Sequence, residues 1–435
     1  MGPGIARVFL RGALGAVVVV ALGTGVFAQA DGPPPVSTPP VAPPPATPPA
    51  SGTAPKPSAP SRPVPGDKTI RPLIESGLLW LGHHQDADGG WRATTVVTHC
   101  DTGAPCDAEV ADKAEIFDVG ITGLAVLALL GTGTSPTSPI VIHGSTADVS
   151  FDTWESTTRA VNWLIAKQDA LGSLSDAKTM YDDCIGAYAL CEASRVGRNA
   201  GWKKAAQRAV EFVVAGQGKA PGGKSLWGWR YVPLETNGDT SVTGWAVRSF
   251  AAAERAGIRV PKGSLAGAEA FIRWITGEKG LVGYLDPAGA GMKVTGHNDA
   301  FDYHVGTMTA LGIQVRLLAE DRQDKASAEW LKLAVNEVLL KDVPTARTPL
   351  GVDYYYWHQA TEAWALLGDN GFATLAQSGK AWRSALVEAL AALQSAPSAK
   401  CSSGGWLQGD RWSYAGGPAY ATAINVLTLE AVAGS

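Results

Sequence analysis

One helix pattern recurs along this chain, and it restricts the possible folds more than any other feature. In its clearest copy, Asp239–Gly257 (DTSVTGWAVRSFAAAERAG), small and apolar residues run nearly all round the predicted helix. Asp239 is a good N-cap, and Gly257 is a good residue to end the helix. A helix that is apolar on most of its faces packs among other helices. The stretch therefore predicts an inner helix of a larger helical array.

Similar stretches begin at four other aspartates and, without the acid, at Pro418. The four are Asp118, Asp183, Asp302 and Asp353. A second helix pattern precedes each copy, from ESGLLWLGHHQ in the first to ALVEALAALQ in the last. One helical hairpin cannot bury its apolar surface alone, so such repeats stack on their neighbours. The sequence predicts an all-α fold of about six hairpins over residues 67–435, closed into a ring.

The N-terminal part of the chain differs in composition from the helical repeats. Residues 1–30 carry two arginines, a short apolar run and an Ala-Gln-Ala end, which together predict a secretory signal peptide. An uncleaved anchor is the alternative, although the run is shorter than the roughly 20 residues that a membrane span needs. Residues 31–66 hold 15 of the 28 prolines and predict a disordered linker. We therefore expect an exported protein. The linker is either a stalk that holds the domain away from a membrane or cell wall, or a disordered leader with no function.

The charge of the chain excludes one class of partner. Its formal net charge is −4, and lysines and arginines do not cluster. The electrostatic footprint of nucleic-acid binding is therefore missing, and we expect no nucleic-acid partner.

The cysteines predict one covalent bridge. Cys100 and Cys106 bracket a short polar loop, so in an exported protein they are expected to form a disulfide, with a free pair as the alternative. Cys184 and Cys191 lie seven residues apart on one predicted helix, and we expect them to be buried apolar residues. The odd total of five leaves at least one thiol unpaired.

The linker of the first hairpin carries a recognisable motif. It reads WLGHHQDADGGW, with Trp80, Gln85 and Trp91 at its key positions, and partial copies follow other outer helices. This motif resembles the QW repeat of squalene and terpenoid cyclases and of the related protein prenyltransferase subunits. The C-terminal GGWLQGDRWSYAGGPAYATAINVLTLE resembles the last repeat of that superfamily. The resemblance covers most of residues 75–432 and implies an α/α toroid, in which parallel inner helices are enclosed by outer helices running the other way.

The catalytic signatures of that superfamily are missing. The stretch Thr236–Thr240 keeps only the last acid, Asp239, of the DxDD motif with which class II terpene cyclases protonate an alkene. Asp182-x-Cys184 and the Asp-Tyr-His at 302–304 resemble zinc-ligand motifs of the prenyltransferases, but a whole repeat lies between them here. Their side chains would be too far apart for one ion. We therefore expect no metal and no other cofactor.

A ring of parallel inner helices would bring all their N-termini to one mouth, where helix dipoles favour anions. N-capping alone explains each capping aspartate, so the ring of acids is a better site candidate than any one of them. The candidate catalytic groups at this mouth are Asp239, Asp302, His304, Asp353 and His358. The candidate ligand contacts are Asp118, Asp183, Tyr303, Tyr354 and Trp357.

Three charges lie at one level of the predicted inner helices, nine residues after the capping acid. They are Glu192, Arg248 and Glu362. An acid–arginine–acid network across the lumen would satisfy them, since buried charges must be paired. The alternative is that some of them face the outer layer.

Two functions remain open at this point. The chain is either a ligand-binding or scaffold toroid for an apolar, peptide or glycan ligand, or an enzyme that acts on an isoprenoid, lipid or polysaccharide at the Asp-rimmed mouth. The missing motifs favour the first hypothesis. The second draws on analogy with α/α toroids that cleave polysaccharides with paired carboxyl groups.

Overall fold

The computed structural model describes most of the chain after residue 67. The described residues are 68–100, 106, 117–144, 150–176, 179–277, 279–287, 289, 291–319, 325–397, 400–407 and 409–434. The predicted signal peptide (1–30) and Pro-rich linker (31–66) lie outside them.

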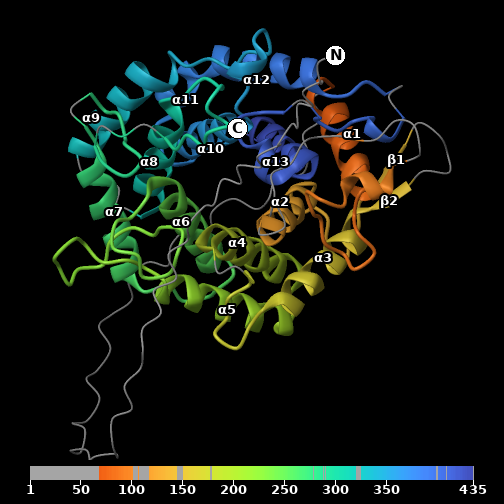
Figure 1. Cartoon of the computed structure of the whole chain (residues 1–435), viewed down its shortest axis with the longest axis horizontal. Coiled ribbons are helices and arrows are strands. Elements are labelled where there is room, and N and C mark those ends of the chain that lie inside the picture. The colour runs from red at the N-terminus through yellow and green to blue at the C-terminus, as the bar shows by residue number, and fades with distance from the viewer. Residues whose placement is uncertain are drawn as a thin grey trace, which may run out of the picture. The chain divides into compact units, whose positions relative to one another are not determined.

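Six of the described helices form an inner ring, and each packs against the next (Figure 1). The last of them packs against the first, so the ring is closed. The inner helices are α2 (Asp118–Gly131), α4 (Met180–Gly197), α6 (Thr240–Arg255), α8 (Gly306–Ala319), α10 (Tyr354–Asp369) and α13 (Ser413–Gly434).

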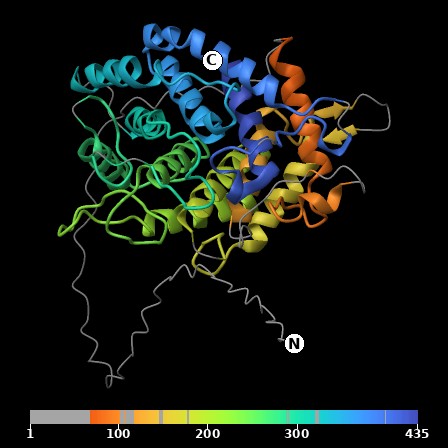
Figure 2. The ribbon, with the colours of Figure 1, turned by 45° about the horizontal axis from the view of Figure 1, so that its top comes forward.

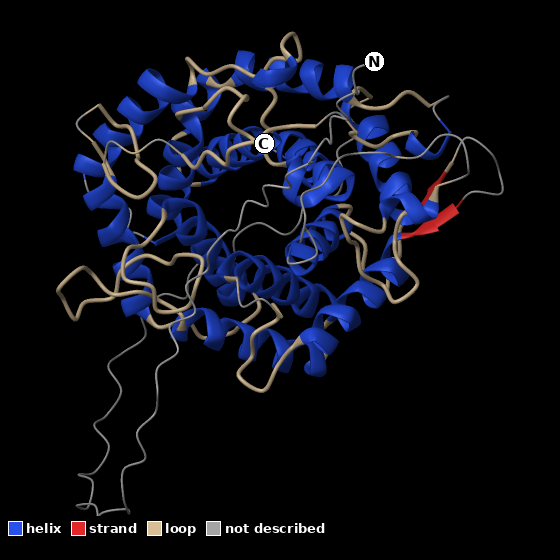
Figure 3. Ribbon diagram, in the orientation of Figure 1, coloured by secondary structure: helices blue, strands red, loops and turns tan. Residues whose placement is uncertain are grey.

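A second layer of helices surrounds this ring, as Figures 2 and 3 show. Its members are α1 (Ile70–His83), α3 (Thr153–Lys167), α5 (Ala200–Ala215), α7 (Lys262–Ile275), α9 (Lys325–Ala334) with the π-turn η3 (Val335–Leu339), α11 (Ala373–Ser378) and α12 (Lys380–Leu393). The minor elements are the antiparallel pair β1 (Val141–His143) and β2 (Ser150–Asp152) and the 3₁₀ turns η1 (Val96–His99), η4 (Pro349–Gly351) and η5 (Lys400–Ser402). The predicted α/α toroid of six hairpins is confirmed. Within the described part of the chain, every helix is too short or too polar to span a membrane.

The two layers differ in the way their residues are buried. Inner helix α6 is buried at every position from Thr240 to Phe250, whereas outer helix α7 buries a single stripe that includes Phe271 and Ile275. Small residues let the inner helices approach one another closely. A Cβ at Gly244 of α6 would lie 2.4 Å from the Leu311 side chain of α8. The apolar, glycine-rich inner pattern thus determines which helices form the ring.

The Gln and Trp of the repeat motif tie several hairpins to their neighbours. The Trp91 indole donates to the Leu81 carbonyl at 2.9 Å, which closes the end of α1. Gln85 donates to the Ser156 carbonyl of the next outer helix at 3.1 Å. Gln394 repeats this bond around the ring and donates to the Leu73 carbonyl of α1 at 2.9 Å. The last hairpin is thereby joined to the first.

Candidate functional site

The N-termini of the inner helices lie together at one end of the ring, which we call the mouth. Hydrogen bonds between neighbouring helix starts show this arrangement. The Tyr181 hydroxyl at the start of α4 donates to Ser241 at the start of α6. The Asp182 carboxylate accepts the backbone N–H of Gly120, in the first turn of α2, at 2.8 Å. The expected gathering of helix N-termini is therefore present.

Two of the five predicted capping acids are N-caps. Asp239 accepts the backbone N–H of Val242 at 2.9 Å, and Asp353 accepts that of Tyr356 at 2.8 Å. Both carboxyl groups are buried.

The other three are not N-caps, so this part of the prediction is wrong. Asp118 lies inside the first turn of α2, 3.5 Å from the Arg92 guanidinium. Asp183 lies inside the first turn of α4 and accepts the N–H of Leu174 in the preceding loop at 2.7 Å. Asp302 is exposed, because its loop continues beyond it to Gly306, where α8 begins.

Two acids at the mouth were missed by the sequence reasoning. Asp182 bonds to α2 as described above, and Asp410 accepts the N–H of Tyr354 at the start of α10 at 2.8 Å. Each of them caps the helix beside its own rather than its own helix. The only signal in the sequence is an acid at or just before the start of an inner helix, and it does not show which helix the acid bonds to.

Burial makes these carboxyl groups weak acids, since desolvation disfavours their charged form. It raises the pKa of Asp182 and Asp410 to about 7 and that of Asp183 and Asp239 to about 6. Burial raises the pKa of Asp353 as well. The mouth thus holds carboxyl groups that are partly protonated close to neutral pH.

Asp239 is the centre of a hydroxyl network, which we call the Asp239 cluster: Asp239, Ser241, Tyr181, Tyr231 and Tyr284. Ser241 donates to Asp239 at 2.6 Å, and the Tyr284 hydroxyl donates to its other oxygen at 3.3 Å. The hydroxyls of Tyr284 and Tyr231 are 2.5 Å apart. The Tyr181 ring stacks on Tyr231, with centroids 5.8 Å apart. A protonatable carboxyl group is therefore surrounded by aromatic rings and hydroxyls from three consecutive repeats.

Further aromatic side chains continue from this cluster. The Trp245 and Tyr355 rings are 6.5 Å apart, and Tyr355 meets Trp412 edge-on at 6.2 Å. Two buried donors beside them, the Trp412 indole N–H and the Tyr420 hydroxyl, have no hydrogen-bond partner among the described residues. Buried donors normally find a partner. These two donors are thus left without a protein partner within the described part of the chain.

The predicted histidines serve the fold of this structure. Both ring nitrogens of His304 are engaged, one with Asp342 at 2.8 Å and the other with the Gly351 carbonyl at 3.1 Å. Burial acts to lower the pKa of His304, but the hydrogen bond to Asp342 and the charges of Asp353 and Asp342 together outweigh it, and the pKa is raised. His358 is buried on α10, where burial lowers its pKa to about 4.

The three aromatic residues predicted to contact a ligand differ in how deeply they are buried. Tyr354 and Trp357 are fully buried in the core and pack edge-on with centroids 5.6 Å apart. Tyr303 is half-buried, and the Arg411 guanidinium lies over its ring at 5.6 Å. Arg411 also donates to the carbonyls of Asp302 and Met292, which holds this loop against the last hairpin. Of the three side chains, only that of Tyr303 is partly exposed.

The predicted lumen network exists in part. Arg248 pairs with Glu362 at 3.1 Å, and it donates to Gln314 at 2.9 Å. Glu192 pairs instead with Arg255 at 2.5 Å, so the expected acid–arginine–acid layer is wrong for this residue. Arg255 lies about two turns beyond Arg248 on the same helix and reaches Glu192 from there.

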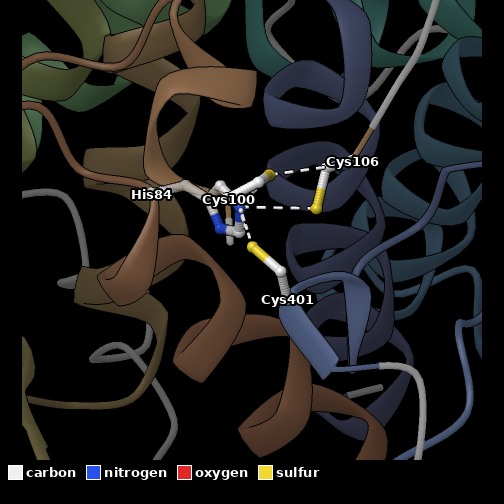
Figure 4. A group of neighbouring side chains, drawn as sticks. All are labelled: His84, Cys100, Cys106 and Cys401. Atoms are coloured by element: carbon white, nitrogen blue, oxygen red, sulfur yellow. Dashed lines mark hydrogen bonds between the residues drawn. The ribbon is translucent and has the colours of Figure 1, made fainter. Parts of the chain in front are cut away.

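The predicted disulfide between Cys100 and Cys106 is not present. Both sulfurs face the Nε2 atom of His84 instead, as does the sulfur of Cys401 (Figure 4). Cys184 and Cys191 are fully buried on α4, as expected. The prenyltransferase-like set is not assembled around an ion, because His304 is bonded to Asp342 and Asp182 to α2.

No family model matches this chain, and no curated protein sequence matches it. Its fold is similar to solved structures. One is the GH76A α-1,6-mannanase from Salegentibacter sp. HEL1_6, with 12% identity, a TM-score of 0.53 and coverage of 84% of this chain and 99% of that one. Another is the unsaturated glucuronyl hydrolase from Bacillus sp. GL1, with 13% identity, a TM-score of 0.54 and coverage of 83% and 96%. A type II terpene cyclase from Scytonema has 13% identity, a TM-score of 0.48 and coverage of 83% and 97%. The chain is thus an α/α toroid protein.

Proposed function

We propose that this protein binds a glycan at the mouth of its inner ring. The observation that carries the proposal is the Asp239 cluster, in which a buried carboxyl group accepts from the hydroxyls of Ser241 and Tyr284 beside a run of aromatic rings. Ligand sites combine apolar surface with a few placed polar groups, and a sugar offers both a ring face and hydroxyls to such a site. The mannanase of similar fold has been captured with α-1,6-mannotriose, which supports this ligand class.

Binding is tested directly with mannotriose, mannotetraose and oligosaccharides that carry an unsaturated glucuronyl unit, by titration calorimetry on the full chain. Trp412→Ala removes a half-buried ring and its unpaired N–H from the mouth, and it should weaken binding at least about tenfold, or about 1.4 kcal/mol. Trp274→Ala is the matched control, because Trp274 is 48% exposed on outer helix α7. Unchanged affinity in Trp412→Ala, or equal losses in both variants, would contradict a site at the mouth.

A second candidate function is hydrolysis of the glycan, and the raised pKa of Asp239 favours it. A carboxyl group with a pKa of about 6 is still partly protonated near neutral pH and can donate a proton to a leaving group. Hydrolysis needs a second carboxyl group as base or nucleophile. Asp353 and Asp410, at the starts of the last two inner helices, are the candidates.

One variant, Asp239→Asn, distinguishes glycan hydrolysis from glycan binding. Asp239→Asn should abolish release of reducing ends while leaving glycan affinity within a few-fold of the parent, if Asp239 is the acid. A parent protein that binds glycan and releases no reducing ends would leave binding as the function.

Two further expectations remain proposals. The QW-type hydrogen bonds of Gln85, Trp91 and Gln394 support a relationship to the terpenoid cyclase and prenyltransferase repeat superfamily. Export through a signal peptide at 1–30 is supported by its sequence alone. N-terminal sequencing of the native protein should begin at Asp31, and a start at Met1 would favour the anchor.

A further inference from the structure

Four metal-binding side chains converge where the last hairpin meets the first. His84 follows the C-terminus of α1, Cys100 follows η1, Cys106 lies six residues further on, and Cys401 belongs to η5. Figure 4 shows the four side chains pointing at one another. Their ligand atoms, His84 Nε2 and the three sulfurs, all lie within 4.8 Å of one another.

The distances between these atoms fit a tetrahedral metal site. His84 Nε2 lies 3.4 Å from the sulfurs of Cys106 and Cys401 and 3.8 Å from that of Cys100. In a zinc site with Zn–N of about 2.0 Å and Zn–S of about 2.3 Å, tetrahedral angles place nitrogen and sulfur about 3.5 Å apart. A disulfide would need two sulfurs about 2.0 Å apart, and none is formed.

The imidazole of His84 is oriented as a ligand. Its Nδ1 lies 2.8 Å from the Trp80 carbonyl, which can only accept, so Nδ1 carries the proton. The lone pair of Nε2 then points at the three sulfurs. The ring is held flat against the Trp80 indole, with centroids 3.9 Å apart. Metal-binding histidines have this outer hydrogen bond to a carbonyl or carboxylate, which fixes their tautomer and orientation.

The sulfurs have N–H donors around them. The backbone N–H of Cys106 donates to the sulfur of Cys100 at 3.1 Å. The Trp80 indole N–H is buried, has no oxygen or nitrogen partner among the described residues, and lies beside the Cys106 sulfur. A thiol is a weak acceptor, whereas a metal-bound thiolate carries charge and benefits from such donors. Both donors therefore suit thiolates better than thiols.

We propose that His84, Cys100, Cys106 and Cys401 bind one zinc ion that fastens the last hairpin to the first. The Cys₃His set with borderline-soft ligands is typical of zinc. Four protein ligands leave no position for a substrate, so the site is structural rather than catalytic. Binding releases the three thiol protons to solvent, and His84 enters as neutral imidazole. This site differs from the set for which the sequence predicted no metal, Asp182 and Cys184 with the Asp-Tyr-His at 302–304.

The first test is the metal content of the full chain, purified in the presence of a reductant and measured by plasma mass spectrometry. We expect about one zinc ion per chain. His84→Ala and Cys401→Ser should each lower the content at least about tenfold, in line with the loss of one of four ligands. The matched controls are His83→Ala, beside His84 but turned to the His99 carbonyl, and Cys191→Ser, buried far from the cluster on α4. Both controls should keep their zinc.

A second measurement keeps the proposal testable if the ligand variants fail to fold. The parent chain, freed of metal with a chelator under reducing conditions, is titrated with Co²⁺. A tetrahedral cobalt–thiolate site gives strong visible absorption that should saturate at about one equivalent and disappear when zinc is added. A reduced parent chain that takes up neither zinc nor cobalt would overturn the proposal. So would zinc that is retained in His84→Ala, or a native Cys100–Cys106 disulfide in the metal-free protein.

Discussion

The mouth and the seam between the first and last hairpins are both rich in titratable groups, but the two regions differ in the kinds of atoms that they bring together. The mouth is lined by oxygen atoms and aromatic rings, and two of its buried donors lack a partner among the described residues. At the seam, nitrogen and sulfur atoms face a single point, and each orienting hydrogen bond is in place. Oxygen atoms and rings suit a ligand with hydroxyl groups, whereas a histidine nitrogen and three sulfurs facing one point suit a metal ion. On our two proposals, the mouth binds a ligand and the seam stabilises the fold.

The largest expected effect is on stability through the seam. An ion that binds only the folded chain stabilises it by about 4 kcal/mol when free zinc is about 1,000 times its dissociation constant. A chelator with reductant should therefore lower the melting temperature of the parent chain clearly, and leave that of His84→Ala unchanged. Trp412→Ala, altered at the mouth, should respond to the chelator like the parent. Differential scanning calorimetry with and without chelator measures this shift. An unchanged melting temperature of the parent chain would contradict a stabilising ion at the seam.

The next effect concerns His358, which the sequence assigned to the mouth. It is fully buried, its Nδ1 lies 3.3 Å from the Thr428 hydroxyl, and Trp245 stacks on it. His358→Ala leaves a cavity and should cost about 2–4 kcal/mol of unfolding free energy, as other large-to-small core changes do. Urea unfolding measures this cost. If the variant instead keeps the stability of the parent and loses glycan affinity, His358 contacts the ligand rather than supporting the core.

The acids of the mouth also make stability depend on pH. Asp182 has a pKa of about 7 in the folded chain because burial disfavours its charge, against about 3.9 for an unfolded aspartate. The folded state then binds the proton more tightly, so this contribution is present below about pH 4 and is lost as the pH rises to about 7. Unfolding free energy measured across this range should fall less steeply with pH in Asp182→Asn. Equal slopes in the two proteins would mean that Asp182 stays ionised.

The sequence predicted the fold well because its signals are local and repeated. Inner helices that are apolar all round, and a Gln and Trp after outer helices, are visible within single repeats. The caps Asp239 and Asp353 are correct for the same reason, since an N-cap bonds within three residues. Asp302 fails because nothing local shows that its loop runs on to Gly306.

The two sites could be predicted less well, because they depend on residues brought together by ring closure. Cys401 is 317 positions from His84, and no spacing in the sequence relates them. Closeness in sequence therefore favoured a Cys100–Cys106 bridge over a shared site. At the mouth, Tyr284 bonds to Asp239 and Tyr231 bonds to Tyr284 from loops between repeats, which the helix pattern does not describe.

The smallest effect separates two acids that the sequence treated alike. Asp239 caps α6 and also accepts from Ser241 and Tyr284, whereas Asp302 is exposed in its loop. Asp239→Ala should cost about 1 kcal/mol of unfolding free energy through the lost cap, and Asp302→Ala should change it by less than about 0.5 kcal/mol. Urea unfolding of both variants at pH 5, 6 and 7 measures the difference.

The effect of Asp239→Ala should also depend on pH, because the pKa of Asp239 is about 6 and its charged form becomes more populated from pH 5 to pH 7. The charged form is the better hydrogen-bond acceptor, but it is also more costly to bury. If desolvation outweighs the cap, as the raised pKa indicates, the loss in Asp239→Ala shrinks toward pH 7. A loss that grows toward pH 7 would mean that the ionised cap is the favoured state, and Asp239 would then be a structural acid rather than a proton donor.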